Sequence, residues 1–185
     1  MLTTNSDWAI RGLPASGPDP ALKGQLMLFG QFVGAWKIVR QWFPLSNTGV
    51  EEWVGEVHFN WVLGGRAIQD VWGQHDPESG HFMPVGTTLR MYDSKLRAWR
   101  STWISPIQNE VRTFIGRPVG SEIVLNERNR GPGCGERWIF SQIRPRSFEW
   151  RAERREAGGG PWEIVELLSL RRANGDEAAP PRGRR

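Results

Sequence analysis

The chain has 185 residues, of which 24 are basic and 20 acidic, and its net charge is +4. This length suits one domain, and a mean hydropathy of −0.50 with 38% hydrophobic residues excludes a membrane span, a coiled coil and a disordered chain. The densest basic segment, residues 144–155, is interrupted by Glu149 and Glu153, so we expect neither a nucleic-acid partner nor a membrane partner.

The N-terminal segment, residues 1–19, contains Pro14, Gly17 and Pro18 and shows no hydrophobic periodicity, so we interpret it as a leader. It has neither the basic nor the apolar region of a signal peptide. Cys134 is the only cysteine, which excludes an intrachain disulfide. We therefore expect a cytoplasmic protein.

A short helix is predicted over residues 20–33. Asp19 can accept a hydrogen bond as the N-cap, and Pro20 suits the first turn. Apolar side chains then recur at helical spacing, at Leu22, Leu26, Phe29 and Val33.

From residue 35 onward the hydrophobic pattern changes to a period of two, and turn residues recur every few positions. This pattern predicts ten strands, over residues 35–43, 50–62, 66–73, 84–93, 97–104, 109–117, 121–128, 135–143, 147–155 and 162–172. The connections are too short for crossover helices, so the sheet should be antiparallel. A sheet of ten strands normally curls or closes, and closure removes its exposed edges.

We therefore predict an all-β protein, a ten-stranded antiparallel up-and-down β-barrel with the short N-terminal helix across one mouth. Its single domain covers residues 20–172, between the leader 1–19 and a tail, 173–185, that we expect to be disordered.

The chain contains 11 tryptophans, and most of them fall on the predicted strands. Large aromatic side chains inside a barrel either fill it or form the apolar walls of a small-molecule cavity. The same residues also suit ordinary packing on a pleated sheet. Alternation alone does not decide which face of a strand points inward, because a slip of one residue inverts the whole strand.

No common catalytic or phosphate-binding motif is present, and we expect no metal site and no cofactor. His75 and His81 flank a Pro/Gly turn, which favours a solvated loop over a metal site. Cys134 lies in a glycine-rich turn with no histidine near it in sequence, so we interpret it as an unreactive thiol.

Three residues are candidates for acid–base chemistry. His58 alternates with Glu56 along a predicted strand and could act as a general acid or base, with Asp70 on a neighbouring strand as its carboxylate partner. The alternative is a histidine with only a structural role. Tyr92, the only tyrosine, either closes a hairpin beside Asp93 or faces the cavity as a proton donor.

Five short segments resemble a known family: Gly34-Ala-Trp36 after the helix, Trp61–Arg66, Gly86–Asp93, Trp99–Trp103 and Leu168–Arg172. The first is similar to the G-x-W signature of calycins, and the set resembles an uncharacterised family of bacterial calycin-like domains, similar to the nitrobindin type of barrel. The resemblance implies a ten-stranded barrel with a small-molecule cavity. It also implies that Trp36 plugs one end beneath Arg171 or Arg172. Haem binding in nitrobindin-like proteins uses a histidine near the C-terminus, and no histidine follows His81.

We draw three functional hypotheses from these observations. The first is a binding protein for a hydrophobic or aromatic small molecule, held by Arg40, Trp42, Trp61, Arg90, Trp99, Trp103, Arg112 and Glu166. The second is an enzyme, such as a cyclase or isomerase, that uses the same cavity with His58, Tyr92 and Asp70 as catalytic residues, and Glu166 is the alternative to Asp70 as the carboxylate of the acid–base pair. The third is an interaction module with a filled barrel, which forms a homodimer through exposed aromatic strands.

Overall fold

The structure is a computed structural model that describes residues 10–45, 50–51, 55–76, 78–128 and 134–173. A 3₁₀ helix, η2 (Pro20–Leu22), leads into α1 (Lys23–Gly30). The strands that follow are β1 (Gly34–Trp42), β2 (Val50–Glu51), β3 (Gly55–Val62), β4 (Ala67–His75), β5 (Phe82–Asp93), β6 (Ala98–Ser105), β7 (Glu110–Val119), β8 (Glu122–Glu127), β9 (Gly135–Arg144), β10 (Ser147–Arg155) and β11 (Glu163–Arg172).

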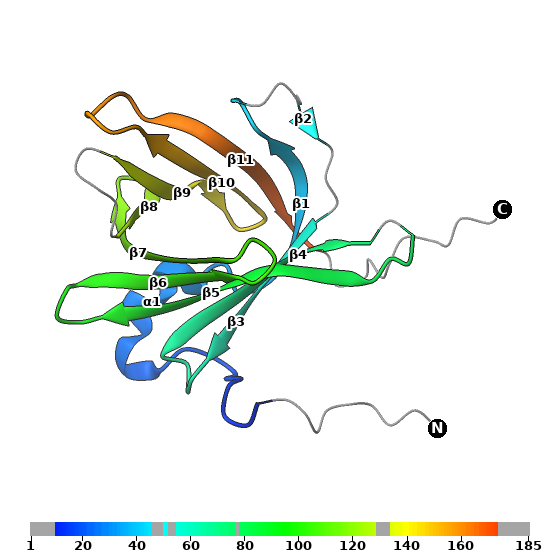
Figure 1. Cartoon of the computed structure of the whole chain (residues 1–185). Coiled ribbons are helices and arrows are strands. Elements are labelled where there is room, and N and C mark those ends of the chain that lie inside the picture. The colour runs from blue at the N-terminus through cyan, green and yellow to red at the C-terminus, as the bar shows by residue number, and fades with distance from the viewer. Residues whose placement is uncertain (1–9, 46–49, 52–54, 77, 129–133, 174–185) are drawn as a thin grey trace.

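Ten of these strands close into an antiparallel barrel. Each strand from β3 to β11 pairs with the next, and β1 pairs with both β3 and β11, so the sheet joins its own ends (Figure 1). The predicted ten-stranded barrel is confirmed. The predicted strand 50–62 is shorter than expected: β3 begins at Gly55, the two-residue β2 adds to the edge of β1, and residues 52–54 lie outside the described ranges.

The N-terminal helix closes one end of the barrel, as predicted. The Asp19 carboxylate accepts the Ala21 N–H at 2.9 Å and caps η2, but α1 ends at Gly30, three residues earlier than expected. Leu26 and Phe29 are fully buried, and the Phe29 ring centroid lies 4.9 Å from that of Trp99. The longest helix in the described ranges is thus the eight-residue α1, and no helix there could cross a membrane.

Arg172, at the end of β11, contacts both Trp36 and the backbone that follows α1 at this closed end. The guanidinium carbon of Arg172 lies 4.2 Å from the ring centroid of Trp36. Arg172 also donates to the carbonyl oxygens of Val33 at 2.8 Å and Gln31 at 2.9 Å. Of the two arginines that the calycin resemblance left open, Arg172 therefore covers Trp36.

The segment before the helix lies along the β3–β4 hairpin. The Ala15 N–H donates to the Trp61 carbonyl at 2.9 Å, the Leu63 N–H donates to the Leu13 carbonyl at 2.9 Å, and Asp19 forms an ion pair with Arg66. Residues 1–9 of the predicted leader and 174–185 of the predicted tail lie outside the described ranges.

Buried residues alternate along the strands and point into the barrel, as Val57, Phe59 and Trp61 do on β3. The described strands contain four register irregularities: one near the start of β10, between Ser147 and Glu149, and three bulges farther along their strands, between Ile38 and Arg40, at Trp72/Gly73 and at Ala152/Glu153. A bulge adds one residue to a strand and so exchanges its inward and outward faces beyond that point. The three bulges lie beside the residues Gln41, Trp72 and Ala152, which line a cavity in the barrel.

Candidate ligand-binding site

The barrel is packed in one half and hollow in the other. In the closed half, next to α1, aromatic and aliphatic side chains fill the interior. The other half holds a cavity of about 580 Å³ that opens toward the end of the barrel away from α1, within the range of small-molecule sites. Its walls come from strands all around this half, including β1, β4, β7, β9, β10 and β11.

Four tryptophans separate the two halves, and we call them the tryptophan floor: Trp72, Trp103, Trp138 and Trp150. Neighbouring ring centroids lie 5.4 to 6.5 Å apart and the planes meet at 61° to 87°, so the four indoles form a closed ring of edge-to-face contacts. All four rings line the cavity. A ligand that enters the open half therefore meets a broad aromatic surface.

A glycine holds one indole of the floor in place. The Trp103 ring packs against the backbone of Gly86 on the neighbouring strand β5, where a Cβ atom would lie 2.4 Å from the ring. This approach is closer than any side chain permits. Gly86 thus fixes the depth of the floor on this side of the cavity.

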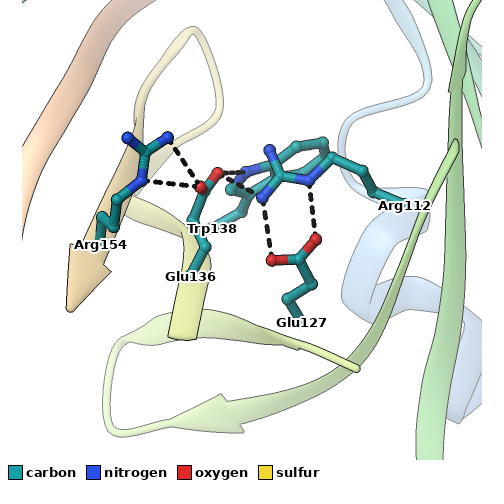
Figure 2. Close-up of polar contacts among 5 residues, drawn as sticks. All are labelled: Arg112, Glu127, Glu136, Trp138 and Arg154. Atoms are coloured by element: carbon teal, nitrogen blue, oxygen red, sulfur yellow. Dashed lines mark hydrogen bonds and ion pairs between the residues drawn. The ribbon is translucent and has the colours of Figure 1, made fainter. Parts of the chain in front are cut away.

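One wall of the cavity carries a paired charge network (Figure 2). Arg112 donates two hydrogen bonds to Glu127, at 2.9 and 3.0 Å, and lies 2.6 Å from Glu136. Glu136 also accepts from the Trp138 indole at 3.2 Å and from Arg154 at 3.3 Å. Burial acts to lower the pKa of Arg112, but its hydrogen bonds and the charges of the two glutamates raise it on balance. The network therefore favours the charged form of Arg112 and orients Trp138.

Glu166, which lines the same cavity from β11, is bonded differently. Its Oε1 accepts a hydrogen bond from the Gln41 amide at 2.7 Å. Burial raises the pKa of the Glu166 carboxyl, the Gln41 hydrogen bond opposes the shift, and the charge of Glu136 adds to it. Glu166 is thus a cavity carboxyl group that keeps its proton to a higher pH than an ordinary glutamate.

A buried ion pair supports the floor from below. Asp70 contacts Arg90, and both side chains are fully buried. Asp70 Oδ1 accepts from the Trp72 indole at 2.8 Å and so orients one member of the floor. The Arg90 guanidinium lies 5.2 Å from the Phe29 ring centroid, and its Nε and Nη2 have no partner among the described residues.

No protein-family model matches the chain, and no curated protein is significantly similar to it. Among solved structures it is similar to the S-type phycobiliprotein lyase CPES from Guillardia theta, with a TM-score of 0.50 and 14% sequence identity over 82% of this chain and 93% of that chain. The chain folds as a calycin-like barrel. At this identity the likeness concerns the fold alone.

Three of the residues predicted to bind a ligand line the cavity of this calycin-like barrel: Trp103, Arg112 and Glu166. A second group lies in the closed half, below the floor, and comprises Trp61, Asp70, Arg90 and Trp99. Tyr92 is half-buried at the same end, with its ring centroid 6.1 Å from that of Trp99. The residues of the second group are part of the packed core.

Arg40, Trp42 and His58 lie on the outer face of the barrel. The bulge after Ile38 places Gln41 inward, so its neighbours Arg40 and Trp42 point away from the cavity. His58 alternates with the inward Val57 and Phe59 and bonds Glu56 at 2.9 Å on the outer surface. The structure therefore does not bring His58, Asp70 and Tyr92 together.

Several cavity residues were not among the predicted site residues, notably Trp72, Trp138, Trp150, Glu136 and Gln41. Alternation in the predicted strands 135–143 and 147–155 places Trp138 on the same face as Phe140, and Trp150 on the same face as Phe148. The lining positions Glu136 and Ala152 share those faces, but the sequence did not show which face was inward. No cluster of three or more metal-binding side chains occurs in the described part of the chain.

Proposed function

We propose that the open half of the barrel binds a hydrophobic or aromatic small molecule, with the apolar part of the ligand resting on the tryptophan floor. The main support is the floor itself, because four indoles line a cavity of about 580 Å³. Burying indole and ligand surface stabilises a complex by about 25 cal/mol for each Å² removed from water. Polar side chains of the wall, among them Gln41 and Glu166, offer the ligand contacts that fix its orientation.

A reaction in the same cavity is the second candidate. Glu166 favours it, because a carboxyl group with a raised pKa can donate a proton as a general acid. The structural neighbour named as a phycobiliprotein lyase is consistent with a barrel of this fold serving an enzyme. Fold similarity is a weak argument for a shared reaction, so binding is the primary proposal.

Titration with the neutral fluorescent probe N-phenyl-1-naphthylamine tests the binding proposal. We expect saturable binding by the wild-type protein with partial quenching of tryptophan emission. Ala152→Phe adds a ring inside the cavity, where Ala152 is buried beside Trp150, and should weaken binding at least about tenfold. Thr102→Phe adds the same ring to the outer face of β6 and is the matched control.

Equal binding by Ala152→Phe and wild type would place the probe outside the cavity and contradict the proposal. The absence of saturable binding to the wild type would contradict it as well. Circular dichroism and thermal unfolding of both variants establish that each is folded at the assay temperature.

A further inference from the structure

The charges that face the cavity are unequally satisfied. Its arginines, Arg112 and Arg154, are both paired with Glu136, and Arg112 binds Glu127 in addition. A ligand carboxylate would have to compete with these glutamates for either guanidinium. The positive groups of the wall are therefore already occupied by the protein.

Glu166 is a partly buried cavity carboxylate without a basic partner among the described residues, whereas Glu110, which also lines the cavity, is exposed to solvent. Among the described residues no arginine, lysine or histidine lies within ion-pair distance of it, and its hydrogen-bond donor is the neutral amide of Gln41. An ionised carboxylate in a partly buried site is costly unless a cation or further donors approach it. The ligand is the group that can supply them.

The register of β10 and β11 places Glu166 beside the aromatic surface. Glu166 pairs with Ala152, and the next inward pair is Trp150 with Leu168. Because Ala152 is small, the space between Glu166 and the Trp150 ring stays open to the cavity. An organic cation is attracted both by a carboxylate and by the face of an indole.

We propose that the ligand carries a protonated amine or another organic ammonium group, held between Glu166 and the tryptophan floor while its apolar part fills the cavity. This inference rests on the proposed function, since it names the chemical class of the molecule that the cavity binds. It excludes a simple carboxylic acid as the preferred ligand.

The pH dependence of binding follows from the groups around Glu166. The titratable side chains that line the cavity together with Glu166 are Glu110 and Arg112 from β7, Glu136 from β9 and Arg154 from β10, whereas β1 contributes the neutral Gln41. Burial and the negative charge of Glu136 raise the pKa of Glu166, so this carboxyl group stays protonated to a higher pH than an ordinary glutamate. An ammonium ligand must displace this proton, so its affinity rises by at most about tenfold per pH unit until Glu166 is ionised and then levels off.

Three probes with one apolar body test the inference: 1-adamantanemethylamine, 1-adamantanemethanol and 1-adamantanecarboxylic acid. Isothermal titration calorimetry should show that the amine binds at least about tenfold more tightly than the alcohol at neutral pH. The acid should bind most weakly. Only the affinity of the amine should rise between pH 4 and pH 7.

Glu166→Gln keeps the size and polarity of the side chain but removes its charge. We expect the variant to bind the amine no more tightly than the alcohol, with no rise of affinity with pH, and to bind the alcohol as the wild type does. Glu163→Gln removes an exposed carboxylate from the same strand and is the matched control, which should retain the preference for the amine.

Wild-type protein that binds the alcohol or the acid as tightly as the amine overturns the inference and leaves the proposed function standing. Loss of amine preference in Glu163→Gln as well as Glu166→Gln overturns the role of Glu166. If none of the three probes binds but N-phenyl-1-naphthylamine does, the inference is wrong and the cavity still binds small molecules. If that probe also fails to bind, the proposed function itself is wrong.

Discussion

The buried pair of Asp70 and Arg90 allows a sharp test of how much an ion pair beneath the tryptophan floor contributes to the stability of the barrel. Asp70 Oδ1 accepts hydrogen bonds from the Trp72 indole at 2.8 Å and the Thr88 N–H at 3.2 Å, and Oδ2 contacts Arg90. In Asp70→Asn the amide oxygen can keep the first two bonds, but the NH₂ group then faces the guanidinium. The substitution therefore removes the ion pair and little else.

We expect Asp70→Asn to lower the free energy of unfolding by about 3 kcal/mol, the lower end of the range for removing one partner of a buried ion pair. Both side chains have zero exposure, so water does not replace the lost charge. The rings of Phe29, Phe59 and Phe140 lie 5.2 to 5.7 Å from the guanidinium carbon and offset part of the loss by cation–π attraction. Burial lowers the pKa of Arg90 to about 9, which indicates how poorly its charge is solvated.

Urea unfolding followed by tryptophan fluorescence measures this loss. Adding Arg90→Met to Asp70→Asn removes the unpaired charge and should restore at least half of the stability. Asp93→Asn, which affects the ion pair with the exposed Arg100, is the control and should cost far less. A loss below about 1 kcal/mol in Asp70→Asn, or no recovery in the double variant, would refute the reasoning.

Three further changes test other parts of the molecule. Arg172→Ala should lower the free energy of unfolding by about 2 kcal/mol in urea titrations, because it removes the stacking on the indole and two hydrogen bonds to the α1 end of the barrel; an unchanged midpoint would contradict this. Gly86→Ala should push the Trp103 ring into the cavity, shift the emission spectrum and weaken binding of N-phenyl-1-naphthylamine about tenfold, and unaltered affinity would show that the floor does not depend on this glycine. Burial acts to raise the pKa of Glu153, but hydrogen bonds from two arginines hold it below its ordinary 4.5. The stability that its carboxylate supplies is therefore present above pH 4.5 and lost at lower pH, so the difference in free energy of unfolding between wild type and Glu153→Gln should shrink from pH 7 to pH 3. A difference that stays constant over this range would show that the carboxylate is unpaired.

The fold could be predicted because it depends on local patterns. Asp19 and Pro20 mark the start of the helical segment, and alternation with short turns implies antiparallel strands that must close. These signals lie within a few residues of one another along the chain. To interpret these signals, one needs to know only that each strand pairs with the strand that follows it in the chain.

The site was harder to predict, because it depends on which face of each strand points inward. His58 and Trp61 stand on opposite faces of β3, so both could not face one cavity, and the sequence does not show which does. On β1 the bulge after Ile38 turns Arg40 and Trp42 outward and Gln41 inward. A bulge of this kind is set by pairing with a strand more than 120 residues away and leaves no local sequence signal.

The division of the barrel into a packed half and a hollow half has a consequence for how such a protein can evolve. Stability comes mainly from side chains next to α1, whereas ligand choice would depend on positions beyond the tryptophan floor. Substitutions in two regions without shared contacts usually have additive effects. Substitutions at the open end can therefore change which ligand is bound while the closed end keeps the chain folded. For the same reason, the open end is the natural place to begin redesigning the cavity.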